Sequence, residues 1–263
     1  MKRITQLKDD ALVALKGNFG MAALATLGIV ALNLAIKWGT YMISGIDIME
    51  YYEAVLEGDF YGMMDAMEGS YYSSLINILI SIFFLAPLGV GIVNTYRLLL
   101  ESKGSENSIF FNFFKLTFSK RYLHIVLVSL LSELLIALLI IPAALIMFLV
   151  GLLIQNAIAI VIFALLTVIY SIWILLLYSQ VNFIILDNPK FDVIDAMRRS
   201  RTLMDGKKWK FILMILSFLG WILLCILTLG IGFLWLMPYL YTTLAAFYCD
   251  IRDAENAGQA EQE

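Results

Sequence analysis

Long runs of apolar residues, separated by short polar segments, dominate the chain. They cover approximately residues 20–43, 75–100, 125–153, 157–186, 211–229 and 231–248. A helix needs roughly 20 apolar residues to cross a membrane, and backbone groups in lipid must be hydrogen-bonded within the segment. No alternating pattern typical of barrel strands is present. The pattern therefore predicts an all-α fold: a polytopic membrane helical bundle with six transmembrane helices.

The composition supports this assignment. Hydrophobic residues make up 62% of the 263 residues and charged residues 15%, whereas soluble domains are closer to half apolar and a quarter charged. One water-soluble core of this size cannot hold so much apolar surface, so lipid must cover part of it. We expect residues 1–250 to form a single integral membrane domain. The polar residues 251–263 are predicted to form a disordered cytoplasmic tail.

The basic residues predict the orientation in the membrane. They gather before the first apolar run, between the second and third, and between the fourth and fifth. Six crossings place all of the 18 Lys and Arg residues except Lys37 on the same side. Since Lys and Arg are retained on the cytoplasmic side, the sequence predicts a multi-pass protein of the cell membrane with both termini in the cytoplasm.

Three amphipathic segments, residues 4–15, 109–118 and 191–204, each precede an outward-going apolar run. Such helices lie in the membrane interface, with apolar side chains at the acyl boundary and cations among the headgroups. We therefore expect cytoplasmic interfacial amphipathic helices. Their recurrence suggests three repeats, each with one interfacial helix and a hairpin of two spans.

One ionisable side chain falls inside a predicted span. Glu133 follows Arg121 by twelve residues, about 18 Å along a helix, which places it deep in the bilayer. Carboxylates at such a depth are costly and often functional, so Glu133 could form a proton or cation relay or an anchor for a headgroup. It could also be a protonated side chain that is hydrogen-bonded to Ser129, Ser132 or Asn77 and serves assembly only. Both interpretations remain open.

The densest positive patch precedes the fifth span. Two interpretations are open: retention of cations on the cytoplasmic side with snorkelling side chains, or binding of anionic phospholipid headgroups at about 1 kcal/mol per cation. Nucleic acid is not an expected partner, because the patch would lie on an anionic membrane surface. The patch consists of Arg198, Arg199, Arg201, Lys207, Lys208 and Lys210.

Residues that could support catalysis are few. The only histidine, His124, lies near the end of the third span. Cys225 and Cys249 lack the spacing of metal ligands. The sequence carries no kinase, hydrolase or phosphate-loop signature. We therefore expect no cofactor, no bound metal and no enzymatic activity.

The last quarter of the chain carries recognisable motifs: the basic run at residues 196–201, "LSFLGW" at 216–221 and "GIGFLWLMPY" at 230–239. The sequence resembles the bacterial integral membrane family catalogued as domain of unknown function 975. That family looks related to six-span proteins that include the membrane domain of some glycerophosphodiester phosphodiesterases. The resemblance implies a fold and a location in the membrane. It implies no reaction and no catalytic residue.

These observations favour a non-catalytic accessory or scaffold protein that acts on membrane partners or lipids. The alternative is a carrier or lipid-handling protein for amphipathic or cationic small molecules that uses Glu133. The expected partners are the lipid bilayer, anionic phospholipids and another membrane protein.

Overall fold

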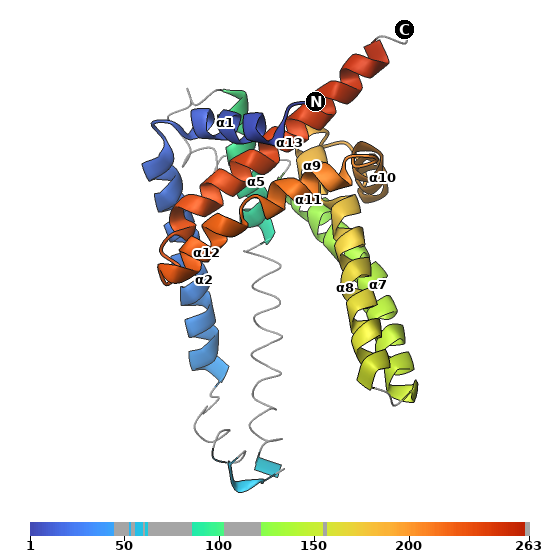
Figure 1. Ribbon diagram of the computed structural model, residues 1–263. Coiled ribbons are helices and arrows are strands. Elements are labelled where there is room, and N and C mark those ends of the chain that lie inside the picture. The colour runs from blue at the N-terminus through green and yellow to red at the C-terminus, as the bar shows by residue number, and fades with distance from the viewer. Residues whose placement is uncertain are drawn as a thin grey trace.

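The computed structural model describes residues 1–44, 53, 56–59, 61–62, 86–102, 122–154 and 157–260 (Figure 1). In this part of the chain the regular elements are all α-helices, which confirms the expected all-α class. They are α1 (Ile4–Leu15), α2 (Phe19–Ser44), α5 (Ala86–Glu101), α7 (Tyr122–Ile154), α8 (Ala157–Tyr178), α9 (Val181–Asp187), α10 (Val193–Leu203), α11 (Lys208–Leu216), α12 (Leu219–Leu227) and α13 (Phe233–Ala260).

Both chain termini lie at the same end of the molecule, here called the terminal end (Figure 1). Helices α2, α7 and α8 extend away from it. Helix α13 packs against α1, α2 and α5. Five of the 7 residues of α9 are buried in the same core. The packed core therefore lies toward the terminal end, around α13 and α9.

Four helical segments are long and apolar enough to cross a membrane, as expected for a membrane protein: Phe19–Gly39, Leu127–Gly151, Ile158–Asp187 and Lys208–Leu227. The predicted second span, residues 75–100, is described only from residue 86 onward. The predicted sixth span falls in α13, which is helical but is not one of the four. The amphipathic segment 109–118 lies outside the described residues. Six spans and three repeats therefore remain predictions.

The structure corrects the interfacial interpretation of the first amphipathic segment. The stripe of α1 that was expected to face lipid is buried in the protein: Leu7, Ala11 and Leu15 are each 0% exposed. Helix α1 packs on α13 and α5. The small side chains of Ala11 and Ala14 permit this close approach.

Two of the expected continuous spans are interrupted. The fourth breaks at residues 179–180, between α8 and α9, and the fifth at residues 217–218, between α11 and α12. At the first break, the Ser200 hydroxyl of α10 accepts from the Gln180 N–H at 3.3 Å and donates to the Leu177 carbonyl at 2.8 Å. At the second, the Lys8 ammonium of α1 donates to the Ser217 carbonyl at 3.0 Å. The amphipathic helices thus satisfy backbone groups that a helix end leaves free.

Within the tail that was predicted to be disordered, the structure describes residues 251–260, and these are helical. Helix α13 does not stop at residue 250 but continues through Ala260. Ile251 is fully buried in the core, and Glu255 forms an ion pair with Arg199 at 2.6 Å. Residues 251–260 contain few apolar side chains, but their contacts come from other helices, which composition does not reveal.

The turn between α12 and α13 has little space at Gly232. A Cβ atom there would lie 2.8 Å from the Cys225 Sγ and 3.1 Å from the Cys225 Cα. We therefore predict that Gly232→Ala lowers the free energy of unfolding by about 1–3 kcal/mol, as overpacking typically does. Thermal or denaturant unfolding of the full chain in lipid nanodiscs measures this.

Gly220→Ala is the matched control, since a Cβ atom at Gly220 meets nothing within 4 Å. Its unfolding should be unchanged or slightly shifted to higher temperature. Adding Cys225→Ala to Gly232→Ala removes the nearest atom and should restore part of the loss. Equal stability of the two glycine variants would contradict the packing described here.

Candidate functional site

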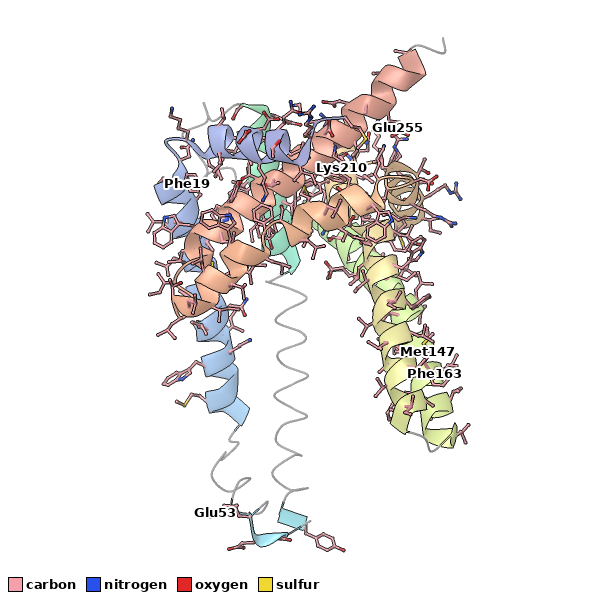
Figure 2. All side chains as sticks on the ribbon, viewed as in Figure 1. Phe19, Glu53, Met147, Phe163, Lys210 and Glu255 are labelled. Carbon is pink, nitrogen blue, oxygen red and sulfur yellow. The ribbon has the colours of Figure 1, made fainter. Side chains whose placement is uncertain are left out.

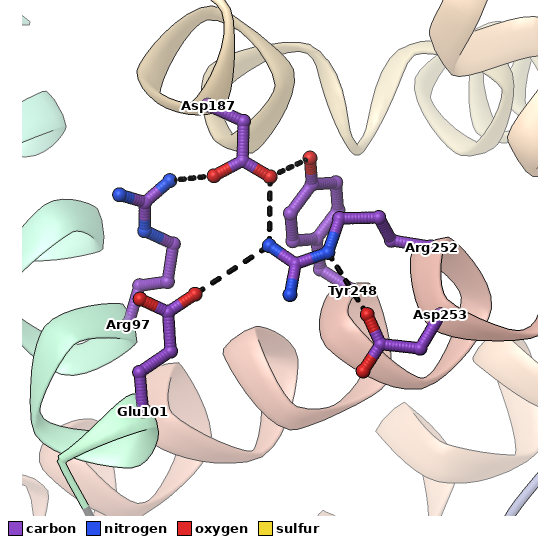
Figure 3. A network of polar contacts seen from close by, with 6 residues as sticks. All are labelled: Arg97, Glu101, Asp187, Tyr248, Arg252 and Asp253. Carbon is purple, nitrogen blue, oxygen red and sulfur yellow. Dashed lines mark hydrogen bonds and ion pairs between the residues drawn. The ribbon is translucent and has the colours of Figure 1, made fainter. Parts of the chain in front are cut away.

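The most connected polar site lies at the end of α9, where Asp187 meets residues from α5 and α13 (Figure 3). Arg97 of α5 donates to one carboxylate oxygen of Asp187. The other oxygen accepts from the Tyr248 hydroxyl at 2.6 Å and from Arg252 at 2.9 Å. Arg252 also lies 3.4 Å from Glu101. These five residues are called the Asp187 junction.

The junction is largely shielded from solvent. The side chains of Arg97 and Asp187 are 10% and 15% exposed, and that of Arg252 is 27% exposed. Partial burial alone would lower the pKa of Arg252, but the hydrogen bond to Asp187 and nearby negative charges outweigh it and raise the pKa above its ordinary value. Arg252 therefore stays charged, and the carboxylate of Asp187 balances charge that would otherwise be poorly solvated.

This geometry fixes helices rather than offering a reactive group. Both oxygens of Asp187 are occupied by donors, so the carboxylate is not free to act as a base toward a substrate. The junction was not among the sites predicted from the sequence. The available signal was an acidic residue placed directly after a long apolar run, on the side of the protein that otherwise gathers Lys and Arg.

Of the predicted intramembrane polar set, the structure describes Glu133, Ser129 and Ser132. Ser129 and Ser132 are each 1% exposed. The Ser129 hydroxyl donates to the Asn182 side chain at 2.9 Å, and the Ser132 hydroxyl donates to the Ser129 carbonyl at 2.6 Å. Glu133 itself is exposed, and Asn77 lies outside the described residues. Ser129 therefore links α7 to α9, and Ser132 is bonded to the backbone of α7 itself. Neither serine hydroxyl donates to Glu133.

Glu133 lies well inside the apolar stretch of its span. The apolar stretch of α7 begins at Leu127, six residues before Glu133, which corresponds to about 9 Å along the helix. The hydrocarbon core is about 30 Å thick, with its middle about 15 Å from either edge. The carboxyl group is thus inside the apolar stretch, about 6 Å from the middle and about 9 Å from the edge at the terminal end.

The predicted cationic patch divides into paired and unpaired members. Arg199 forms an ion pair with Glu255 at 2.6 Å, and Lys210 forms one with Asp250 at 3.0 Å. Both carboxylates belong to α13. These two cations are therefore neutralised inside the protein and hold α10 and α11 against the C-terminal helix.

The other members of the patch have no carboxylate partner among the described residues. Arg198 and Arg201 are exposed on α10, and Lys207 is half-buried at the turn before α11. The Lys208 ammonium lies over the Trp173 ring, 4.0 Å from its centroid. Within the described part of the chain, no group of three His, Cys, Asp or Glu residues is placed to hold a metal ion.

The model of the family described as "Protein of unknown function (DUF975)" matches residues 1–255. The chain belongs to this family. The matched range includes residues 196–239, which carry the motifs described above, and it extends over nearly the whole chain. No curated protein and no solved structure matches. The relation of DUF975 to the phosphodiesterase membrane domains stays a prediction.

The Asp187 junction generates a stability prediction. Asp187→Asn removes the charge that balances Arg97 and Arg252, so we expect it to lower the free energy of unfolding by about 3 kcal/mol or more. Asp253→Asn is the control, because Asp253 also contacts Arg252 but its side chain is 65% exposed. The control should change stability by less than about 0.5 kcal/mol.

Denaturant unfolding in lipid nanodiscs, read by circular dichroism, compares the two variants. Protease cleavage near residue 255 should also accelerate in Asp187→Asn alone. If both aspartate variants unfolded like the natural chain, the junction would not be holding α5, α9 and α13 together.

Proposed function

We propose that this protein is a non-catalytic accessory protein that binds another membrane protein through the hairpin of α7 and α8. The observation that carries the proposal is an exposed carboxylate, Glu133, at the point where this hairpin leaves the packed core.

The hairpin joins the rest of the protein through one end. Near the terminal end, Ile125 and Val128 of α7 and Ile174 and Leu177 of α8 are buried. Farther along, none of residues 133–150 in α7 and none of residues 158–173 in α8 is buried. Figure 1 shows the two helices side by side, extending away from the core. Most of the hairpin surface is therefore available to lipid or to a partner.

The two helices of the hairpin hold each other. The Thr167 hydroxyl lies 3.1 Å from the Met147 sulfur, and the Tyr170 hydroxyl donates to the Leu139 carbonyl at 3.4 Å. Met147 and Phe163 lie on the two facing helices (Figure 2). The hairpin is thus a preformed surface, which reduces the ordering cost of binding.

Lipid alone satisfies apolar side chains but not the carboxyl group of Glu133. A carboxylate inside the apolar stretch is costly unless it finds a polar partner, and Ser129 and Ser132 are already engaged elsewhere. A polar side chain on the transmembrane helix of another protein would satisfy it by an interhelical hydrogen bond. This supports a partner-binding role, in which Glu133 gives specificity and the hairpin gives area.

The alternative, a carrier that uses Glu133, requires a path to that residue. Glu133 lines none of four cavities that the described residues form. We therefore favour the accessory role.

A photo-crosslinking residue at Leu138, whose side chain is 64% exposed on α7, tests the proposal in cells. We expect one protein adduct of defined mass. Glu133→Leu should reduce its yield at least fivefold, because an interhelical hydrogen bond in a membrane is worth about 1–2 kcal/mol. Glu133→Gln, which keeps hydrogen-bonding capacity, should retain most of the adduct.

The matched control places the same crosslinker at Leu223, which is 62% exposed on α12 and should give no such adduct. Glu133→Leu should leave thermal unfolding unchanged, because the side chain is exposed. Lipid adducts alone at Leu138, or a protein adduct that is indifferent to Glu133→Leu, would contradict the proposal.

A further inference from the structure

A groove lies between α8 and α11, which belong to two of the segments that are long and apolar enough to cross a membrane. The groove does not include Glu133. The groove has a volume of about 470 Å³, within the range of about 300–1,000 Å³ that ligand sites occupy. It is lined by Ile172, Trp173 and Leu176 of α8 and by Lys208, Trp209 and Ile212 of α11.

The groove has an apolar wall and one cationic end. Ile172 and Leu176 are four residues apart on α8, so they lie on one face of that helix, and Ile212 provides the opposite wall. Lys208 supplies the cation, with its ammonium 4.0 Å from the centre of the Trp173 ring. An acyl chain fits the first feature and an anionic headgroup fits the second.

The cationic end coincides with the beginning of α11 at Lys208. The first turn of a helix has free backbone N–H groups and the positive end of the helix dipole, which favour an anion. Lys207 is adjacent and has no carboxylate partner among the described residues, whereas Lys210 in the same turn is paired with Asp250. The unpaired positive charge in this turn therefore lies on Lys207 and Lys208.

Two tryptophans mark the level at which this end would lie in a membrane. The Trp173 and Trp209 side chains are 52% and 74% exposed. Exposed tryptophans are typical of the boundary between acyl chains and headgroups. An exposed carboxylate, Asp205, lies in the turn before α11 and would oppose an anion there.

We propose that the groove between α8 and α11 binds one phospholipid with an anionic headgroup. Its phosphate lies at Lys208 and the first turn of α11, and one acyl chain lies along Ile172, Leu176 and Ile212. Within the cationic patch, Lys208 lines the groove and therefore binds the lipid. Arg199 and Lys210 do not, because carboxylates of α13 already balance their charges.

Native mass spectrometry of the purified full chain in detergent tests this. The chain is titrated with phosphatidylglycerol or phosphatidylcholine carrying identical acyl chains. We expect the first phosphatidylglycerol to bind at least fivefold more tightly than phosphatidylcholine. Lys208→Gln should weaken that first step about fivefold, which corresponds to about 1 kcal/mol for one cation.

Lys16→Gln is the control, since Lys16 is exposed after α1 and carries the same charge. It should leave the first binding step unchanged, and Asp205→Asn should strengthen it. An equal loss in Lys208→Gln and Lys16→Gln would show unspecific attraction and overturn the site. So would equal affinity for the two lipids.

Ile212→Trp fills the groove without changing charge. It should abolish the first, tighter lipid step while the thermal unfolding of the chain stays the same. If it changed the mass of the assembly and not lipid binding, the groove would be a contact between protein chains. Because these measurements use purified protein and lipid, their failure is distinguishable from the absence of a Glu133-dependent partner.

Discussion

The hydrogen bonds that Asp187 accepts from Arg97, Tyr248 and Arg252 are the interaction on which the arrangement of the core depends. Three helices far apart in the sequence, α5, α9 and α13, meet at this one carboxylate. Apolar packing alone tolerates helices that slide or rotate past one another. A shielded carboxylate with fixed donors tolerates this much less, because any slip leaves a charge unpaired. We infer that the junction sets the register of α13 against the other helices.

The same requirement, that polar backbone groups inside the core find partners, explains the places of α1 and α10. Two apolar segments are broken, and each break leaves backbone groups without helical partners. Ser200 of α10 fills one break, and Lys8 of α1 fills the other while its ammonium also lies 4.1 Å from the centre of the Phe218 ring. An amphipathic pattern is compatible with a membrane surface or with a protein surface. Here the buried face of α1 and the polar contacts of both helices belong to the protein.

Some charged side chains form ion pairs within the protein, and others have no such partner among the described residues and are available to bind lipid or another protein. Carboxylates of α13 neutralise Arg199 and Lys210, which leaves Lys208 beside an apolar groove. Glu133, in contrast, is exposed on α7, and the hydroxyls of Ser129 and Ser132 donate to other groups. The lipid site and the partner surface proposed here both start from a charge that the described part of the protein does not balance.

The sequence by itself determined the all-α class, the apolar segments, and the concentration of basic residues, because these depend on composition and on contacts along one helix. It also singled out Glu133 and the basic patch. Only the tertiary structure decided which charges are paired, that α1 is buried, that α13 continues to Ala260, and that Asp187 joins three helices. Glu255 and Arg199 are 56 residues apart, and Asp187 and Arg97 are 90 apart. Pairing between residues so far apart in the sequence depends on how the helices pack, and local patterns along the sequence do not show it.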